Sequence, residues 1–211
     1  MGIITKLETS NSKGRINIYI DEKFSMSVKD EIIYSLYIRK GQTINEDRLK
    51  EIVEEESYIK AKSKALNILK FSSKSEKEIV DKLKKNDFED KTINRVLEFL
   101  KKYDFINDNR LAKNMIKSKV NSKKLGKNRV KRDLYKKGVS DSIIEEEIDE
   151  NLDEEIEFEN ALELAYKKKS NLKDTDKRKL YEKIGRFLVY RGYDFELVKR
   201  VLNRVLKNEE Y

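Results

Sequence analysis

One short pattern occurs three times along the chain, at intervals of about fifty residues. It reads LKKNDFEDKTI at 83–93, LYKKGVSDSII at 134–144 and LVYRGYDFELV at 188–198. Apolar residues coincide in the three copies at five aligned positions: Ile79, Val130 and Ile184; Leu83, Leu134 and Leu188; Phe88, Val139 and Tyr193; Ile93, Ile144 and Val198; and Leu97, Ile148 and Leu202. This spacing predicts two helices, each with one apolar face, joined by a turn.

The turn position is occupied by Asp87, Gly138 and Gly192. Glycine suits the left-handed residue that ends a helix, and in the first copy we expect the neighbouring Asn86 to take this role. A further periodic segment precedes each pair (AKSKALNIL, NRLAKNMI and ENALELAY), and small side chains in it allow close helix approach: Ala65, Ala112, Ala161 and Ala165. The chain is therefore predicted to be mostly α-helical, a tandem array of three three-helix repeats that forms an elongated, curved strip. Chance similarity among helices rich in lysine and leucine is the alternative, and agreement at six positions in three copies disfavours it.

The first sixty residues have a different pattern. RINIYID (15–21) and KFSMSV (23–28) alternate apolar and polar residues around a short polar turn. This predicts a β-hairpin with Phe24, Met26 and Val28 on its apolar face, which GIITKLET (2–9) would extend by a third strand. DEIIYSLYI is predicted to be helical and to stop at Gly41, and Asn45 to cap a long helix after it. Ser75 with Glu78 predicts a capping box at the second helix of the first repeat.

These patterns divide the chain into four segments. Residues 1–58 would hold the hairpin and a helical segment, and residues 59–107, 108–152 and 153–211 would hold the first, second and third three-helix repeats. Proline is absent and only seven glycines occur in 211 residues, so long helices are permitted nearly everywhere.

Charge is abundant and segregated: 42% of residues are charged, and the formal net charge is +8. One run contains a single acid, Asp133, and ten basic residues: Lys117, Lys119, Lys123, Lys124, Lys127, Arg129, Lys131, Arg132, Lys136 and Lys137. Such density is typical of a surface that contacts nucleic-acid phosphates in a salt-sensitive and sequence-tolerant way. The alternative is a solvated helix face in a lysine-rich protein.

A second basic cluster contains Lys167, Lys168, Lys169, Lys173, Lys177, Arg178, Lys179, Arg186 and Arg191. Tyr181, Phe187, Tyr190 and Tyr193 are interleaved with it, a combination that can stack on single-stranded nucleic acid. Because some of these aromatic residues share helical spacing with apolar ones, we expect at least half of them to belong to the core. Gly185 is predicted to mark a close helix crossing.

The stretch from Ser140 to Asn160 holds acidic residues and no basic one. It could solvate a helix face, neutralise the basic run of its own repeat, or meet a basic partner. An acidic face also predicts that any DNA contact is one-sided.

The sequence gives little support for catalysis or for metal binding. The chain has no histidine and no cysteine, so it lacks an imidazole base, a thiolate nucleophile and both of the commonest transition-metal ligands. GKNRVK lacks the second glycine of a phosphate loop, and DFINDNR lacks the spacing of a calcium loop. We therefore predict no catalysis, no cofactor and no metal site. The start of the chain has no signal-peptide pattern, and no apolar run of membrane-spanning length occurs, so we expect a cytoplasmic protein without membrane contact.

The segment FSSKSEKEIVDKLKKNDFEDKTINRVLEFLKKYDFINDNRLAKNMI (71–116) resembles the central signature of the RecX family of bacterial regulatory proteins. The family's S-E-x-E-L opening corresponds to Ser75–Ile79, its K-G-[FY/I] turn to Lys85–Phe88, and its L-x-D-x-x-[FY]-A motif to Ile106–Ala112. RVKRDLYKKGVSDSII resembles the second repeat, and the hairpin followed by IRKGQTINEDRLKEI resembles the longer form of the family. Departures are Leu111 for an aromatic residue, Asp133 for Glu, and Asn86-Asp87 for the glycine turn.

The resemblance implies a non-enzymatic regulator of the RecA recombinase. It would bind along the RecA–single-stranded DNA filament and restrain the filament's growth, ATP hydrolysis and strand exchange. The implied partners are the recombinase and single-stranded DNA, with double-stranded DNA as a further sequence-tolerant ligand, and we expect a monomer. From the basic run itself, and independently of the resemblance, we expect that reversing the charge of Lys123, Lys124, Lys127 and Arg129 together abolishes binding to the RecA–DNA filament. The alternatives are a helical-repeat scaffold that contacts only proteins and a non-specific DNA-binding helical protein.

Overall fold

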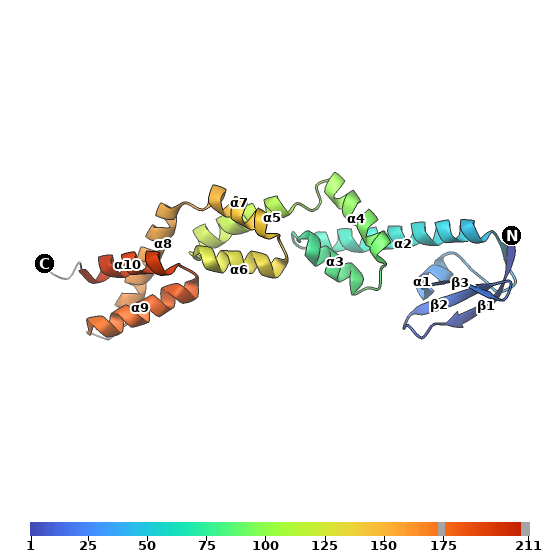
Figure 1. The fold of residues 1–211 in the computed structure, drawn as a ribbon, viewed down its shortest axis with the longest axis horizontal. Coiled ribbons are helices and arrows are strands. Elements are labelled where there is room, and N and C mark those ends of the chain that lie inside the picture. Colours follow the sequence, from blue (N-terminus) through green and yellow to red (C-terminus); the bar gives the residue numbers. More distant parts are fainter. Residues whose placement is uncertain (173–175, 208–211) are drawn as a thin grey trace. The chain divides into compact units, whose positions relative to one another are not determined.

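The computed structural model describes residues 1–172 and 176–207 (Figure 1). Two compact units divide the chain: the first holds residues 1–72 and 80–103, and the second holds residues 73–79 and those from 104 onward. Elements of the first unit are β1 (Gly2–Thr9), β2 (Arg15–Ile20), β3 (Lys23–Lys29), α1 (Asp30–Ser35), β4 (Thr43–Ile44), α2 (Glu46–Leu69) and α4 (Asp90–Lys102). Helix α3 (Glu76–Lys84) contributes to both units.

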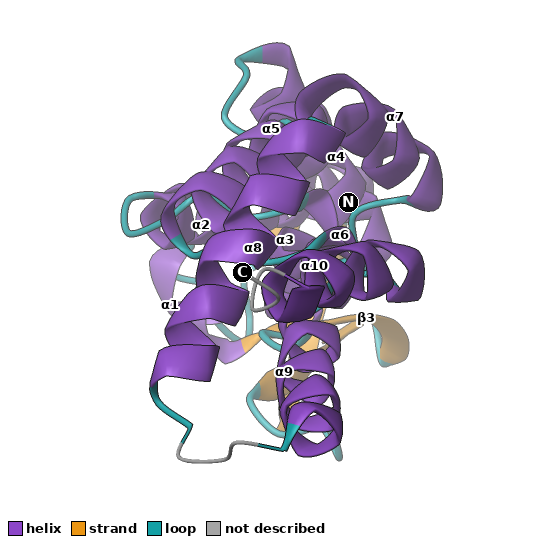
Figure 2. Cartoon of the chain, turned by 90° about the vertical axis from the view of Figure 1, so that its left-hand side faces the viewer, coloured by secondary structure: helices purple, strands orange, loops and turns teal. Residues whose placement is uncertain are grey.

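The second unit is helical throughout its described residues. Its elements are α5 (Asp108–Lys117), a π-helical turn η1 (Ser118–Ser122), α6 (Lys127–Lys137), α7 (Asp141–Asn151), α8 (Glu154–Ser170), α9 (Lys177–Arg191) and α10 (Phe195–Lys207). Strands, drawn in orange in Figure 2, occur only in the N-terminal region of the described chain. Among the described residues, no helix is long and apolar enough to cross a membrane.

The N-terminal strands form an antiparallel sheet in the order β3-β2-β1-β4, so the predicted hairpin and third strand are confirmed. Ile18 and Val28 are buried beneath α1 and α2, and Met26 is half-buried. The prediction for Phe24 is wrong, because its side chain is exposed. A register shift between Ile18 and Tyr19 pairs Tyr19 with Phe24 and moves that end of β3 out of the simple alternation, so the two rings meet edge to face at 5.9 Å.

The helix after the sheet is shorter than predicted. α1 ends at Ser35 rather than at Gly41, and Tyr37 adopts a left-handed backbone with φ 53°. The cap of the next helix is confirmed, because the Asn45 side chain accepts a hydrogen bond from the N–H of Arg48 at 3.0 Å.

The three repeats are confirmed by burial. Fourteen of the fifteen aligned apolar residues are buried, and only Phe88 is half-buried, with the Lys29 ammonium 3.7 Å from its ring centre. The first repeat comprises the C-terminal part of α2 with α3 and α4, the second α5–α7, and the third α8–α10. The four alanines of the first helices are fully buried, in accordance with close helix packing: Ala65, Ala112, Ala161 and Ala165.

Each of the three turns has a left-handed residue at the same aligned position. Asp87 has φ 57°, Gly138 has φ 78° and Gly192 has φ 97°. The expectation that Asn86 would supply this conformation is wrong, because Asp87 supplies it. Aspartate tolerates the left-handed region better than most residues with a side chain.

Candidate nucleic-acid interface

The ten basic residues of the run 117–137 are spread over several elements of the second repeat. Lys117 ends α5, Lys119 lies in η1, and Lys123 and Lys124 lie in the link to α6. Helix α6 carries the other six residues of the run. The candidates therefore do not form a single stripe, and their surroundings must be considered one by one.

Six of the ten cations have acidic partners within the second unit. The ion pairs are Lys119–Asp133, Lys124–Glu163, Lys127–Asp149 at 3.9 Å, Arg129–Asp133 at 3.6 Å, Lys131–Glu145 at 2.6 Å and Lys137–Glu78 at 3.0 Å. Burial by itself would raise the pKa of Asp133, but the hydrogen bond from Lys119 and the neighbouring positive charges outweigh it and hold the pKa below its ordinary value. These cations are engaged within the protein's own fold.

The remaining four cations have no acidic partner among the described residues. Lys117, Lys123, Arg132 and Lys136 are exposed, and we call them the unpaired basic set. Arg132 and Lys136 lie one turn apart on α6, and Tyr135, 44% exposed, is the i+3 neighbour of Arg132. The exposed side of α6 thus offers two cations without an acidic partner among the described residues and, next to Arg132, an accessible ring, which suits contact with phosphates and stacking on a base.

Acidic residues that follow the run supply some of its internal partners. Glu145 and Asp149 on α7 bind Lys131 and Lys127, whereas Glu147 is buried. Glu157 on α8 is also buried, and its carboxylate accepts a hydrogen bond from the N–H of Lys127 at the start of α6, at 2.6 Å. Burial raises the pKa of Glu157 above its ordinary value, although this hydrogen bond opposes the shift.

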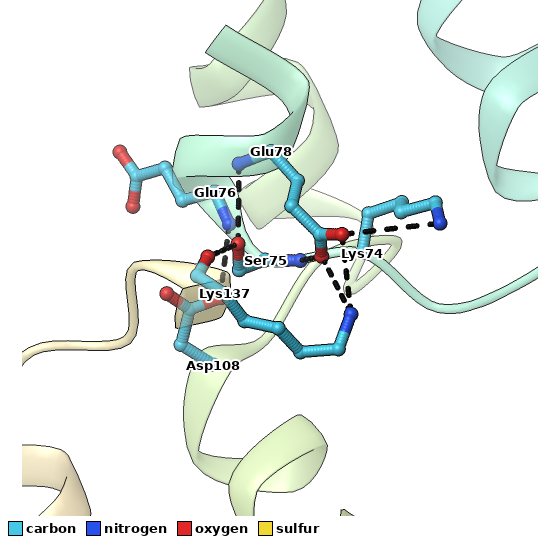
Figure 3. A network of polar contacts seen from close by, with 6 residues as sticks. All are labelled: Lys74, Ser75, Glu76, Glu78, Asp108 and Lys137. Carbon is cyan, nitrogen blue, oxygen red and sulfur yellow. Dashed lines mark hydrogen bonds and ion pairs between the residues drawn. The ribbon is translucent and has the colours of Figure 1, made fainter. Parts of the chain in front are cut away.

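The start of α3 is built into a polar network with the end of α6 (Figure 3). The predicted capping box is confirmed: the N–H of Ser75 donates to the Glu78 carboxylate at 3.0 Å, and the N–H of Glu78 donates to the Ser75 hydroxyl oxygen at 3.1 Å. The Ser75 hydroxyl in turn donates to the backbone carbonyl of Lys137, and the N–H of Glu76 donates to the Asp108 carboxylate at 3.0 Å.

Glu78 is the charged centre of this network. Its carboxylate accepts from the Lys137 ammonium at 3.0 and 3.1 Å and lies 3.9 Å from Lys74. Burial alone would raise the pKa of Glu78, but the Ser75 N–H and the Lys137 ammonium hold it below its ordinary value. Lys137 therefore has a structural role at the end of α6, which removes it from the surface available to a ligand.

The start of α6 meets the end of α9 in a similar way. The N–H groups of Gly126 and Asn128 donate to the carbonyls of Arg191 and Gly192, at 3.1 and 3.0 Å. The Arg191 guanidinium returns hydrogen bonds to the carbonyls of the link between η1 and α6, and the buried Tyr193 hydroxyl donates to the Lys124 carbonyl at 2.9 Å. Arg191 is thus a structural residue rather than an open cation.

Sequence reasoning missed these helix-to-helix junctions. A capping box and turn glycines were visible in the sequence, but neither indicated that each helix end bonds to another repeat. Such partners follow from the stacking of repeats and have no local signal.

The second basic cluster lies on α8 and α9. Lys167, Lys168 and Lys169 occupy the last turn of α8, where Lys169 donates to the Val205 carbonyl at 3.2 Å and Lys168 lies 5.5 Å from the Phe187 ring centre. Arg178 and Arg186 both pair with Glu182, at 3.7 and 3.0 Å. Lys177 and Lys179 lie exposed in the first turn of α9, and Lys173 falls outside the described residues.

The aromatic residues of this cluster divide between core and surface. Tyr193 is buried and Phe187 half-buried, whereas Tyr181 and Tyr190 are exposed. Gly185 does mark a close approach, because a Cβ atom at this position would lie 3.3 Å from the Leu202 side chain of α10. Only the two exposed tyrosines remain available for stacking.

Comparison with known proteins matches the chain along nearly its whole length. The RecX N-terminal domain model matches residues 2–45, and the models of the first, second and third RecX three-helix domains match residues 61–100, 107–147 and 154–202. A "Regulatory protein RecX" of Clostridioides difficile is 46% identical over 100% of this chain and 99% of its own length. One of Clostridium acetobutylicum is 41% identical over 96% of this chain and 95% of its own length.

Solved structures agree with these relatives. A crystal structure of a regulatory protein RecX is 25% identical, with a TM-score of 0.65 over 99% of this chain and 100% of that chain. The crystal structure of RecX from Lactobacillus salivarius shares the fold, with 24% identity and a TM-score of 0.67 over 72% of this chain and 97% of that chain. The sheet, the three repeats and these full-length relatives together show that the chain belongs to the RecX family of regulatory proteins.

Proposed function

We propose that this protein binds a RecA–single-stranded DNA filament and inhibits its assembly, ATP hydrolysis and strand exchange. The observation that carries the proposal is the unpaired basic set of the second repeat, because its charges are exposed and have no acidic partner in the part of the chain that the structure describes. Membership of a regulatory family supports a binding role rather than a catalytic one. Helical repeats suit this role because their surface can contact several subunits of an extended partner.

The DNA contact would be made through phosphates and would be strongly salt-dependent. If the unpaired basic set neutralises four phosphates of a single strand, the affinity should fall about fifty-fold between 50 and 200 mM salt. The rival function, a scaffold that contacts only proteins, is favoured by the internal neutralisation of six of the ten cations in the run. It predicts little affinity for DNA at any salt concentration in that range.

The structure changes which residues should be mutated. Lys124, Lys127 and Arg129 hold acidic partners, so reversing their charges would disturb the fold as well as any ligand contact. The unpaired basic set (Lys117, Lys123, Arg132 and Lys136) can be changed to glutamate with less structural cost, because each side chain is exposed. A matched control changes four exposed lysines of the first unit by the same total charge: Lys13, Lys23, Lys40 and Lys85.

The test measures binding of a fluorescent oligothymidylate, alone and coated with the cognate RecA, over a series of salt concentrations. The quadruple variant of the unpaired basic set should lose most of the salt-dependent affinity, whereas the control variant should retain it. Equal losses in both variants would indicate a general effect of net charge and would contradict the assigned surface. Wild-type affinity in the first variant would contradict it as well.

A titration of DNA-dependent ATP hydrolysis distinguishes two modes of inhibition. Inhibition far below one copy per recombinase subunit would indicate that filament growth is blocked at the end. Inhibition only near saturation would indicate binding along the filament. Unchanged hydrolysis despite binding to bare DNA would refute the recombinase as partner.

A further inference from the structure

An apolar groove lies between α9 and α10 of the third repeat. Its volume is about 450 Å³, and its lining includes Tyr181, Val189, Tyr190, Phe195 and Leu202. The side chain of Val189 is 50% exposed, that of Phe195 70% and that of Tyr190 72%. Solvated apolar residues gathered in one groove, rather than scattered singly, indicate an interaction site.

Helix α9 carries two apolar stripes, and only one belongs to the core. Leu180, Ile184 and Leu188 follow one another at helical spacing and are buried in the core of the third repeat. The neighbouring stripe, Tyr181, Gly185 and Val189, has the same spacing but lines the groove. Packing within the repeat explains the first stripe, whereas in the second stripe Tyr181 and Val189 remain exposed.

Gly185 contributes to the depth of the groove. A glycine within a helix costs about 1 kcal/mol relative to alanine, so its presence in the middle of α9 calls for a reason in packing. A Cβ atom at this position would lie 3.3 Å from Leu202 and 4.0 Å from Val198, both on α10. Glycine thus lets α10 approach closely, and it leaves the space above unfilled by a side chain.

The charged side chains along the groove are mainly basic. Glu182, Arg186 and Lys199 line it, and Arg178 beside it pairs with Glu182 at 3.7 Å. Arg186 pairs with Glu182 as well, at 3.0 Å, so these four side chains carry three positive charges and one negative charge, a net charge of +2. This charge favours an anionic ligand and disfavours a basic one.

We propose that this groove binds the apolar face of an amphipathic helix whose polar flanks are acidic, supplied by a protein partner. Apolar side chains of the partner would enter between Tyr190, Val189 and Phe195, and its carboxylates would meet Lys199, Arg186 and Arg178 along the groove. A protein segment fits better than nucleic acid, because Val189, Val198 and Leu202 line the groove together with the rings and offer no donor or acceptor to a base edge. The inference adds a protein contact to the proposed function and is independent of the DNA contacts of the second repeat.

The test uses the full-length protein and a fluorescent helical peptide of about five turns. The probe has leucine and phenylalanine along one face and glutamate elsewhere. One control peptide replaces each glutamate by lysine, and another replaces each leucine and phenylalanine by serine. The acidic amphipathic peptide should bind saturably in fluorescence anisotropy, and both controls should bind at least about tenfold more weakly.

Two variants of the protein locate the site. Tyr190→Ala and Val189→Asp should each weaken the peptide at least about tenfold, because they remove an anchor or place a charge in the groove. Tyr34→Ala is the matched control, since Tyr34 is also 72% exposed but lies on α1. Circular dichroism of each variant checks that the helices are intact, and oligothymidylate binding should be unaffected by Val189→Asp.

Three outcomes would overturn the proposal. The first is equal binding of the acidic and lysine peptides, and the second is unchanged peptide affinity in both groove variants. The third is displacement of the peptide by oligothymidylate together with loss of oligothymidylate binding in Tyr190→Ala, which would assign the groove to nucleic acid. Failure of the unpaired basic set to bind DNA would refute the DNA contact and leave this inference intact.

Discussion

Replacing Gly192 by alanine should separate the third repeat from the second. Gly192 follows α9 with φ 97°, and a Cβ atom there would lie 2.5 Å from the backbone nitrogen of Arg129 and 2.8 Å from its Cα. Backbone atoms cannot move aside as a flexible side chain can. The end of α9 must therefore withdraw from the start of α6.

The expected loss of stability combines two effects. Left-handed backbone costs a residue with a Cβ about 1–2 kcal/mol. Withdrawal also breaks the hydrogen bonds from Gly126 and Asn128 to the end of α9, each contributing about 1 kcal/mol. Gly192→Ala should therefore lower the free energy of unfolding by about 3–4 kcal/mol. Gly138→Ala should cost less, because the atoms nearest its added Cβ belong to the side chain of Lys77.

Urea unfolding followed by circular dichroism at 222 nm tests this expectation. In the wild-type protein, stacked repeats should unfold with shared cooperativity. In Gly192→Ala, the third repeat should unfold at lower urea, which would split or broaden the transition. A wild-type midpoint and slope in Gly192→Ala would refute the close contact between α9 and α6, and a larger loss in Gly138→Ala would refute the distinction between backbone and side-chain neighbours.

Three further predictions concern helix ends and buried charge. Ser75→Ala should lower the free energy of unfolding by about 1–2 kcal/mol in urea titrations, because it removes a helix cap and leaves the Lys137 carbonyl without the Ser75 hydroxyl. Ser75→Thr should retain most of the wild-type stability, because it keeps the hydroxyl. Because the pKa of Glu157 is raised in the folded state, its contribution to stability should decline as pH rises above about 4.5, and Glu157→Gln should abolish this decline in unfolding midpoints measured from pH 4.5 to 7. Lys29→Met removes the ammonium that binds the Asn86 carbonyl and should therefore destabilise the first unit. Hydrogen exchange of the α3 amides should be faster in this variant than in the wild type, and equal protection in the two proteins would exclude a stabilising role for Lys29.

The repeat architecture could be predicted because its signals are local and recur. The aligned apolar positions report burial directly, and the caps at Asn45 and Ser75 depend on residues three positions away. The position of Phe24 could not be predicted, because the register shift that exposes it depends on how β2 and β3 pair. The helix predicted after the sheet is too long for a similar reason. Apolar residues continue after Ser35, but Tyr37 adopts a left-handed backbone, which is incompatible with a continued helix.

The candidate site was harder to predict than the fold. A run of ten cations beside one acid suggested an open anion-binding surface, but six of the ten have acidic partners, and four of these partners come from other segments. Glu78 and Glu163 illustrate the reason, since each lies well outside the run and reaches it only through packing of helices. A sequence shows how many charges lie in a segment, whereas their availability to a ligand depends on carboxylates that approach from elsewhere.

The turn after α3 differs from the other two because a different group covers its helix end. Gly138 and Gly192 each lie against the start of a preceding helix, where a Cβ atom would meet Lys77 or the backbone of Arg129. After α3, the carbonyl of Asn86 is instead bound by the Lys29 ammonium of the N-terminal sheet, and the side chain of Asp87 remains exposed. Lys29 reaches the Asn86 carbonyl with its terminal ammonium, whereas the Cβ of Lys77 would lie 2.6 Å from a Cβ at Gly138. An aspartate that tolerates φ 57° is therefore sufficient after α3. Asp87 also attracts the Lys29 ammonium, whose pKa burial lowers. After α3, a charged side chain of the N-terminal sheet thus binds the helix end. After α6 and α9, a glycine turn packs directly against a helix of the preceding repeat.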